Sequence, residues 1–177
     1  MASLFRSLVG LLRGANRGIV RVVEQPTTAQ PTTGEPGRGG SSRTIEVRPP
    51  GRKGLRIQYA PSADGDPDAG EVVWTWVPYE ENDGRGKDRP VLVIGRAGGE
   101  RVYAVKLTSK SHDRDRDYLP IGSGPWDGQG RPSWVDIEQL YSVHPAGMRR
   151  EAAALDLDTF VKVAAALQRR YGWEASR

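Results

Sequence analysis

The sequence has no cysteine and only two histidines among its 177 residues. The missing thiols exclude disulfides and thiolate metal sites, and His112 and His144 are too far apart in the chain for a local zinc motif. No stretch approaches the ~18 consecutive apolar residues that a membrane-spanning helix needs. The basic N-terminus is broken by Arg13 and lacks a small-residue cleavage site, so it makes a poor secretory signal. We therefore expect a soluble, cytoplasmic protein without stable membrane insertion.

Positive charge is concentrated near the N-terminus. The formal net charge is +4, but residues 1–60 hold 10 Lys and Arg against 3 Asp and Glu, whereas residues 61–177 hold 16 against 19. The basic character of the whole chain is therefore no argument that its folded part binds nucleic acid. If that part does so, it must use a local patch.

Composition divides the chain into four segments. Residues 1–24 form a basic arm whose leucines are spaced for an amphipathic helix, although its glycines oppose one. Residues 25–43 are mostly Pro, Thr, Gly, Ser and Gln, which is typical of a flexible linker. Residues 44–69 contain two short strand patterns, IEVRP and LRIQYAP, and we interpret them as an N-terminal extension. The strand patterns become strong from residue 70, so we place the main domain at residues 70–173.

The main domain reads as β-strands followed by one helix. The strand patterns are EVVWTWVP, VLVIG, RVYAVKLTS, DYLPIG and SWVDI, and the short connection RAGGE after the second is typical of a hairpin. The helix has apolar residues at helical spacing, namely Leu157, Phe160, Val161, Ala164, Leu167 and Tyr171. Asp156 or Asp158 is placed to cap it, and Gly172 to end it. The sequence predicts a mainly β protein, a small antiparallel barrel with a C-terminal α-helix across it.

Cationic and hydroxyl side chains gather at the ends of two predicted strands. They are Arg85, Lys87 and Arg89 in the expected loop 79–89, and Thr108, Ser109, Lys110 and His112 after the strand RVYAVKLTS. Such groups suit phosphate binding. The alternative is that these charges only protect exposed strand edges from aggregation. The sequence has no P-loop, dinucleotide fingerprint or nucleophile elbow.

Four motifs follow one another before the closing helix. They are Gly-Glu-Val-Val-Trp at 70–74, Arg-Pro-Val-Leu-Val-Ile at 89–94, Leu-Thr-Ser-Lys at 107–110 and Gln-Leu-Tyr-Ser-Val at 139–143. In this order they resemble the MazF/PemK family of toxins from bacterial type II toxin–antitoxin systems. The resemblance covers about residues 70–171. It implies a half-open antiparallel SH3-like barrel of the MazF/CcdB type, with a C-terminal α-helix, that forms a homodimer.

The resemblance also implies a sequence-specific endoribonuclease that cleaves single-stranded RNA without a metal or cofactor. Arg89 matches the catalytic arginine of the family and Thr108 its catalytic threonine. RNA supplies its own nucleophile, the 2′-hydroxyl, so the protein needs only proton transfer and stabilisation of the charge on phosphorus. Arginine, with a pKa above about 12, is a poor proton shuttle, so we assign Arg89 to clamping the phosphate. His112 and Asp88 are the candidate general bases.

Further contacts and partners follow from the same resemblance. We expect the RNA to contact Arg85, Lys87, Ser109 and Lys110, and an unpaired base to stack on Trp126. Trp126 lies in the turn-rich segment 122–132; core packing is the commoner use of tryptophan. A cognate antitoxin with an acidic tail would meet the same basic groove, and the complex would bind operator DNA. Two other interpretations stay open: a non-enzymatic binding module of this fold, such as a gyrase poison, and a scaffold that only binds partners.

Overall fold

The computed structural model describes residues 36–62, 64 and 66–176. The predicted arm 1–24 and the linker up to residue 35 lie outside the described residues. Within the described residues, none of the helices has the length and apolar character needed to cross a membrane.

Ten strands and one α-helix make up most of the described chain. The strands are β1 (Ile45–Val47), β2 (Arg56–Gln58), β3 (Glu71–Pro78), β4 (Gly86–Arg96), β5 (Val102–Thr108), β6 (Tyr118–Gly122), β7 (Ser133–Asp136), β8 (Leu140–Val143), β9 (Met148–Ala154) and β10 (Glu174–Ser176). Two short 3-10 helices, η1 (Gly40–Ser42) and η2 (Pro145–Gly147), precede β1 and β9, and α1 (Leu157–Tyr171) precedes β10.

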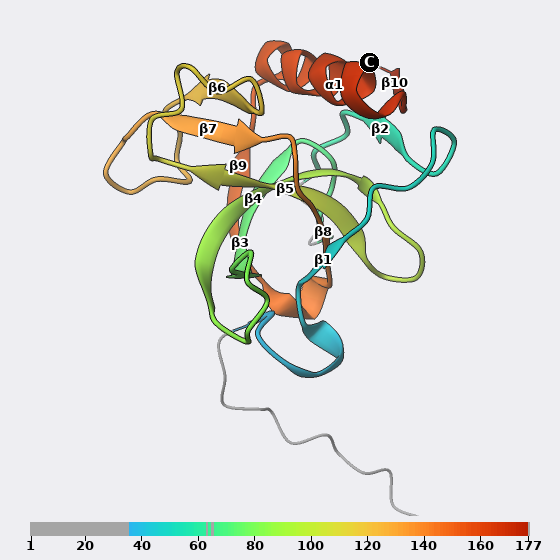
Figure 1. Cartoon of the computed structure of the whole chain (residues 1–177), viewed down its shortest axis with the longest axis vertical. Helices are drawn as coiled ribbons and strands as arrows, with labels where there is room; N and C mark the ends of the chain where they lie inside the picture. Colours follow the sequence, from blue (N-terminus) through green and yellow to red (C-terminus); the bar gives the residue numbers. More distant parts are fainter. Residues whose placement is uncertain (1–35, 63, 65, 177) are drawn as a thin grey trace, which may run out of the picture. The chain divides into compact units, whose positions relative to one another are not determined.

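Eight strands form one curled antiparallel sheet. Six of them follow the order β1-β8-β5-β4-β3-β9, and the other two are attached through β7, which pairs with β5 on one side and with β6 on the other. The sheet is a half-open barrel, and α1 lies beside β2 and β10 across one end of it (Figure 1). This arrangement confirms the predicted fold, a mainly β half-barrel with one C-terminal helix.

Both faces of the sheet are covered by apolar side chains. Side chains alternate along a strand, so Val91 and Val93 of β4 belong to one apolar cluster and Leu92 and Ile94 to another. All four are fully buried. The second cluster also contains the buried face of α1, including Phe160 and Leu167, so the helix closes the larger of the two cores. The unbroken apolar run in β4 therefore reflects burial on both faces.

The ends of α1 are fixed as its sequence predicts. Asp156 is the N-cap and accepts the backbone N–H of Thr159 at 2.9 Å. Gly172 ends the helix with φ 73°, a left-handed conformation that glycine adopts without a Cβ clash. The next residue, Trp173, is fully buried and donates its indole N–H to the carbonyl of Pro50 at 2.9 Å. Together with the parallel pairing of β10 and β2, this ties the C-terminus to the N-terminal extension.

Residues 36–43 are the part of the predicted linker that the structure describes. Residues 36–43 hydrogen-bond to the sheet: Trp76 donates its backbone N–H to the carbonyl of Pro36 at 3.3 Å, and the guanidinium of Arg101 donates to the carbonyls of Ser41 and Arg43 at 3.1 and 2.6 Å. Polar composition predicted a linker, but these backbone groups find partners on the barrel and order the segment.

A buried polar cluster, here called the hydroxyl cluster, follows this segment. It consists of the Thr44 and Thr75 hydroxyls and the Gly147 carbonyl. Thr75 donates to that carbonyl at 2.7 Å, so Thr44 is the donor in its 2.8 Å hydrogen bond with Thr75. Both threonines are completely buried. The cluster fastens the start of β1 and η2 onto β3.

Two strands differ from the sequence-based expectation. β4 begins at Gly86, so Lys87, Asp88 and Arg89 lie on a strand and not in the expected loop. β9 has the sequence MRREAAA, which shows no strand pattern, yet its backbone pairs with β3. An open edge of the sheet offers hydrogen-bonding partners that outweigh local propensity.

Candidate active site

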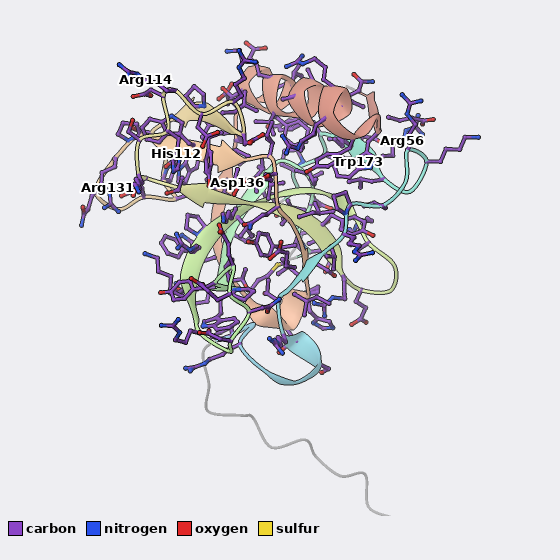
Figure 2. All side chains as sticks on the ribbon, in the orientation of Figure 1. Arg56, His112, Arg114, Arg131, Asp136 and Trp173 are labelled. Carbon is purple, nitrogen blue, oxygen red and sulfur yellow. The ribbon has the colours of Figure 1, made fainter. Side chains whose placement is uncertain are left out.

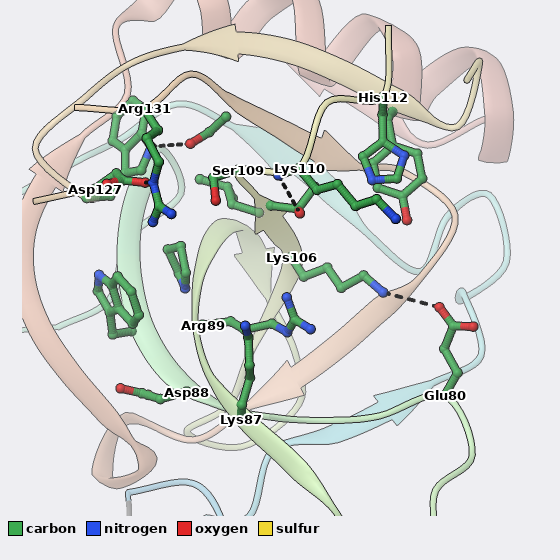
Figure 3. Close-up of a pocket in the computed structure, with 17 residues that line it drawn as sticks. Glu80, Lys87, Asp88, Arg89, Lys106, Ser109, Lys110, His112, Asp127 and Arg131 are labelled. Atoms are coloured by element: carbon green, nitrogen blue, oxygen red, sulfur yellow. Dashed lines mark hydrogen bonds and ion pairs between the residues drawn. The ribbon is translucent and has the colours of Figure 1, made fainter. Parts of the chain in front are cut away.

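The candidate site lies where β5 changes its pairing partner. β5 pairs with β4 as far as Lys106, which faces Val91, and it continues with β7 through Leu107 and Thr108. Extending the β4–β5 register by two residues puts Arg89 opposite Thr108. Because the two strands no longer pair there, their side chains border a pocket of about 480 Å³ (Figure 3).

The pocket brings together most of the residues singled out in the sequence. Eight of them line it: Lys87, Asp88, Arg89, Thr108, Ser109, Lys110, His112 and Trp126. The ninth, Arg85, lines a second pocket of about 310 Å³, which shares Arg89, Lys106 and Glu80 with the first. The exposed guanidinium of Arg85 pairs with Asp83, with Nε 2.6 Å from Oδ2. Arg85 therefore lies beside the main pocket and not in it.

Arg89 and Thr108 keep hydrogen-bonding capacity in the pocket. Arg89 is half-buried, and its side chain forms neither a hydrogen bond nor an ion pair with any residue that the structure describes. Thr108 is also half-buried; its Oγ1 accepts the backbone N–H of Lys110 at 3.2 Å. Its hydroxyl proton has no acceptor among the described residues. A guanidinium and a hydroxyl are thus both available to donate to a ligand.

The two candidate bases have different surroundings. The carboxylate of Asp88 pairs closely with the guanidinium of Arg149, which lies 5.6 Å from the ring centroid of Trp74. The imidazole of His112 stacks on Tyr118 with ring centroids 3.6 Å apart, and its Nδ1 is 3.8 Å from Oδ2 of Asp115. Nδ1 faces a carboxylate, which leaves Nε2 as the nitrogen that could accept a proton from a substrate.

The prediction that Trp126 stacks on RNA is not supported by its position. Only 4% of Trp126 is exposed, and it belongs to the core cluster that contains α1. Its indole N–H donates to Oγ of buried Ser133 at 3.1 Å. Trp126 lines the pocket as part of its wall and is buried in the core. It anchors the turn-rich segment 122–132 to the barrel.

Sequence reasoning missed Lys106, whose ammonium reaches three acceptors. Nζ lies 3.2 Å from Oδ2 of Asp136 and 3.6 Å from Oε1 of Glu80, and it hydrogen-bonds to Oε1 of Gln139. The same Gln139 oxygen accepts the hydroxyl proton of Tyr141 at 2.8 Å. Lys106 precedes Thr108 by two residues, and this period-2 spacing could have placed both side chains on one face.

Other residues at the pocket were also missed. Burial, and then the charge of Asp136, raises the pKa of Tyr118 to about 12. At the rim, Asp127 pairs with Arg131, with Oδ2 2.9 Å from Nε. The backbone N–H of Gln129, and then Arg131, lowers the pKa of the Asp127 carboxyl. Figure 2 shows His112, Arg131 and Asp136 around β6 and β7. No sequence motif marks these residues, because they come together only through the pairing of β5, β6 and β7.

The site combines hydrogen-bond donors, cations and one imidazole with three carboxylates, and each carboxylate is paired with a cation: Glu80 with Lys106, Asp88 with Arg149 and Asp127 with Arg131. Across the described residues, no group of three or more His, Cys, Asp or Glu is arranged to hold a metal ion. The chemistry that the arrangement suits is binding of an anion and stabilisation of negative charge on it.

Several solved structures are similar to this chain. MazF from Deinococcus radiodurans is 21% identical, covering 60% of this chain and 97% of that chain, with a TM-score of 0.47. A MazE–MazF structure from the same organism is 20% identical and covers 60% and 96%, with a TM-score of 0.45. An endoribonuclease from a mycobacterial species is 15% identical and covers 61% and 94%, with a TM-score of 0.42. No curated protein matches the sequence.

The family assignment rests on a sequence match of a different kind. The family described as PemK-like, MazF-like toxin of type II toxin–antitoxin systems matches residues 68–170, which is more than half of the chain and contains the whole pocket. The chain therefore belongs to the PemK-like, MazF-like toxin family.

Proposed function

We propose that this toxin is a sequence-specific endoribonuclease that cleaves single-stranded RNA through the 2′-hydroxyl of the substrate. The observation that carries the proposal is that two side chains with free hydrogen-bond donors, Arg89 and Thr108, line one pocket where β4 and β5 stop pairing. Around them the ammonium groups of Lys87, Lys106 and Lys110 line the same pocket. A polyanion whose reacting group is a phosphate fits this arrangement.

In the proposed reaction the 2′-oxygen attacks the neighbouring phosphorus and the P–O5′ bond breaks. The products are a 2′,3′-cyclic phosphate and a 5′-hydroxyl; one proton leaves the 2′-oxygen and one is added to O5′. Arg89 offers a planar fork to two phosphate oxygens as negative charge builds on them, and Thr108 donates a third hydrogen bond. Neither group needs a metal ion to act.

His112 is the better candidate for the general base. Histidine is the residue that most often serves as a general base, whereas the carboxylate of Asp88 is committed to the guanidinium of Arg149. In this assignment Nε2 of His112 takes the proton of the 2′-hydroxyl, and Asp115 steadies the imidazolium through Nδ1.

The test is incubation of the purified chain with a mixed RNA pool, followed by sequencing of the cleaved ends. We expect one short motif at the cut. RNA with 2′-deoxyribose at the cleaved nucleotide should resist cleavage, and EDTA should leave the rate unchanged. Cleavage of the 2′-deoxy substrate or an absolute need for magnesium would contradict the mechanism. Absence of any cleavage would favour the non-enzymatic binding module.

The proposal includes a cognate antitoxin and a homodimer. The lysines of the pocket and Arg89 suit an acidic antitoxin segment that orders as it binds, and the same complex would bind operator DNA. Light scattering at micromolar concentration should return twice the chain mass. A monomer that cleaves RNA at the full rate would contradict the dimer.

A further inference from the structure

Lys106 lies where β5 exchanges β8 for β7 as its neighbour. Extending the β5–β8 register by two residues from its last pair puts Lys106 opposite Gln139. Extending the β5–β7 register by one residue puts it opposite Asp136. Both residues are observed as partners of its ammonium group. The sheet topology therefore brings two acceptors to one cation, one from the last residue of β7 and one from the residue that precedes β8.

Each acceptor is itself held in place. The side chain of Asp136 is only 3% exposed, and its Oδ1 accepts the backbone N–H of Glu138 at 2.8 Å. The Gln139 oxygen also accepts the hydroxyl of Tyr141. A lysine side chain is ordinarily flexible and loses conformational entropy when it is ordered. Here that ordering is already complete, since the side chain of Lys106 is only 13% exposed.

One of the three N–H donors of the Lys106 ammonium group has only a weak partner, and it faces the pocket. Asp136 and Gln139 account for the other two donors. The third donor meets Glu80, whose side chain is 70% exposed and 3.6 Å away, an ion pair that solvent screens strongly. Figure 3 shows Lys106 extending past Arg89 toward Glu80. These three residues line both pockets, so the pair of Lys106 and Glu80 lies at their shared wall.

We propose that Lys106 is a phosphate-binding residue for RNA, held in position by Asp136 and Gln139, and that the bound phosphate displaces the carboxylate of Glu80. The proposal rests on the proposed ribonuclease function. Arg89 binds the reacting phosphate. Lys106 pairs with Val91, which follows Arg89 by two residues on β4. Lys106 therefore binds the phosphate next to the reacting one. Glu80 then acts as a built-in competitor that weak or misplaced ligands do not displace.

The main test is the salt dependence of binding by the full chain. The probe is the RNA that the wild-type protein cleaves, with 2′-deoxyribose at the cleaved nucleotide. Lys106→Met combined with Asp136→Asn removes both charges and keeps an acceptor for the Glu138 N–H, so no buried charge is left unpaired. This variant should bind several-fold more weakly, and the slope of log K against log salt should fall by about 0.7, the value for one phosphate contact on a single strand. Lys162→Met, an exposed lysine on α1, is the control and should change neither.

A second comparison tests the displacement of Glu80. Glu80→Gln should tighten binding of the same probe several-fold because Lys106 no longer has a competing carboxylate. Glu81→Gln removes the same charge from a neighbouring exposed residue of the second pocket and should have a smaller effect. In the Lys106→Met/Asp136→Asn background, the two substitutions should have equal effects, since only general repulsion remains.

The outcomes separate this proposal from the proposed function. If the wild-type chain cleaves RNA but the double variant keeps the wild-type slope, Lys106 is a structural cation and the inference is wrong. Equal effects of Glu80→Gln and Glu81→Gln in the wild-type background would overturn the displacement. If the wild-type chain cleaves no RNA in the pool, the proposed function fails and this inference fails with it. The double variant must be folded, as shown by an unchanged circular dichroism spectrum, for the comparisons that use it; the comparison of Glu80→Gln with Glu81→Gln in the wild-type background stands without it.

Discussion

Thr75 on β3 and Arg89 on β4 are cross-strand partners, so their side chains leave the same face of the sheet at neighbouring positions. Thr75 is completely buried, and the hydroxyl cluster satisfies it with Thr44 and Gly147. Arg89 is half-buried and has no polar partner among the described residues. The first position uses its hydrogen bonds for the folded state, whereas the second keeps them for a ligand. Substitutions should therefore divide into those that reduce stability and those that reduce activity.

The largest effect is expected at Arg89. Arg89→Lys keeps the charge but replaces a planar fork by a point charge, and Arg89→Ala removes both. Loss of a preorganised donor to the transition state costs about 10²–10³ in rate, so both variants should lose roughly that factor in RNA cleavage. Their unfolding midpoints should match the wild type.

The matched control for Arg89 is Arg56→Lys. Arg56 lies on β2, is largely exposed and lines neither candidate pocket. The Arg56→Lys variant should cleave RNA at the wild-type rate. Full cleavage by Arg89→Lys would show that the position needs only a positive charge, and the clamp would have to be abandoned.

Thr108 should show a smaller effect of the same kind. Thr108→Val keeps the shape and removes one hydrogen bond to a charged group, which corresponds to about a 10- to 100-fold loss of rate. Thr108→Ser retains the hydroxyl and should keep much of the activity. Single-turnover cleavage measures both. If the valine variant were as active as the serine variant, the hydroxyl would have no role in the reaction.

The hydroxyl cluster should respond in the opposite way. Thr75→Val is nearly isosteric but leaves the Gly147 carbonyl and the Thr44 hydroxyl without their buried partner. Such a loss costs about 1–3 kcal/mol in the free energy of unfolding, measurable by urea denaturation. RNA cleavage by the folded variant should be unchanged, and Thr108→Val should show the reverse pattern. A catalytic defect in Thr75→Val at full stability would contradict the separation between the hydroxyl cluster and the pocket residues Arg89 and Thr108.

The sheet could be predicted from the sequence, because apolar runs mark the strands. Arg89 and Thr108, which the quoted motifs place at strand ends, line the same pocket. The sequence did not reveal Lys106 as part of the site. The partners of Lys106, Asp136 and Gln139, follow it by about thirty residues, and only the exchange of β8 for β7 beside β5 brings them to it. Pairing between strands so distant in the chain leaves no local pattern.

Trp126 and residues 36–43 are in surroundings that composition alone does not indicate, and for the same physical reason. Trp126 lies in a segment rich in glycine and proline, which predicted an exposed ring, yet the ring packs into the core and Ser133 satisfies its N–H. Residues 36–43 have the composition of a linker, yet the barrel supplies donors and acceptors for their backbone. In both cases tertiary contacts outweigh what composition predicts.

The smallest expected effect concerns Glu46, which lies on β1 opposite Tyr141 and close to the Lys106 network. Desolvation by burial raises the pKa of its carboxyl, Lys106 opposes this, and Glu80 and Asp136 add to it. A carboxyl whose pKa is raised by folding favours the folded state when protonated and loses that contribution as the pH rises through the folded-state pKa. At about pH 7 the charged form is therefore slightly unfavourable, and Glu46→Gln should be more stable than the wild type by up to about 0.5 kcal/mol, the usual range for surface substitutions.

The gain in stability from Glu46→Gln should shrink on acidification and vanish below the ordinary glutamate pKa of about 4.3. Urea unfolding at both ends of this range measures it, with Glu81→Gln as the control for loss of one exposed charge. A gain that persists at the acidic end would mean that the amide stabilises the folded state for a reason unrelated to titration.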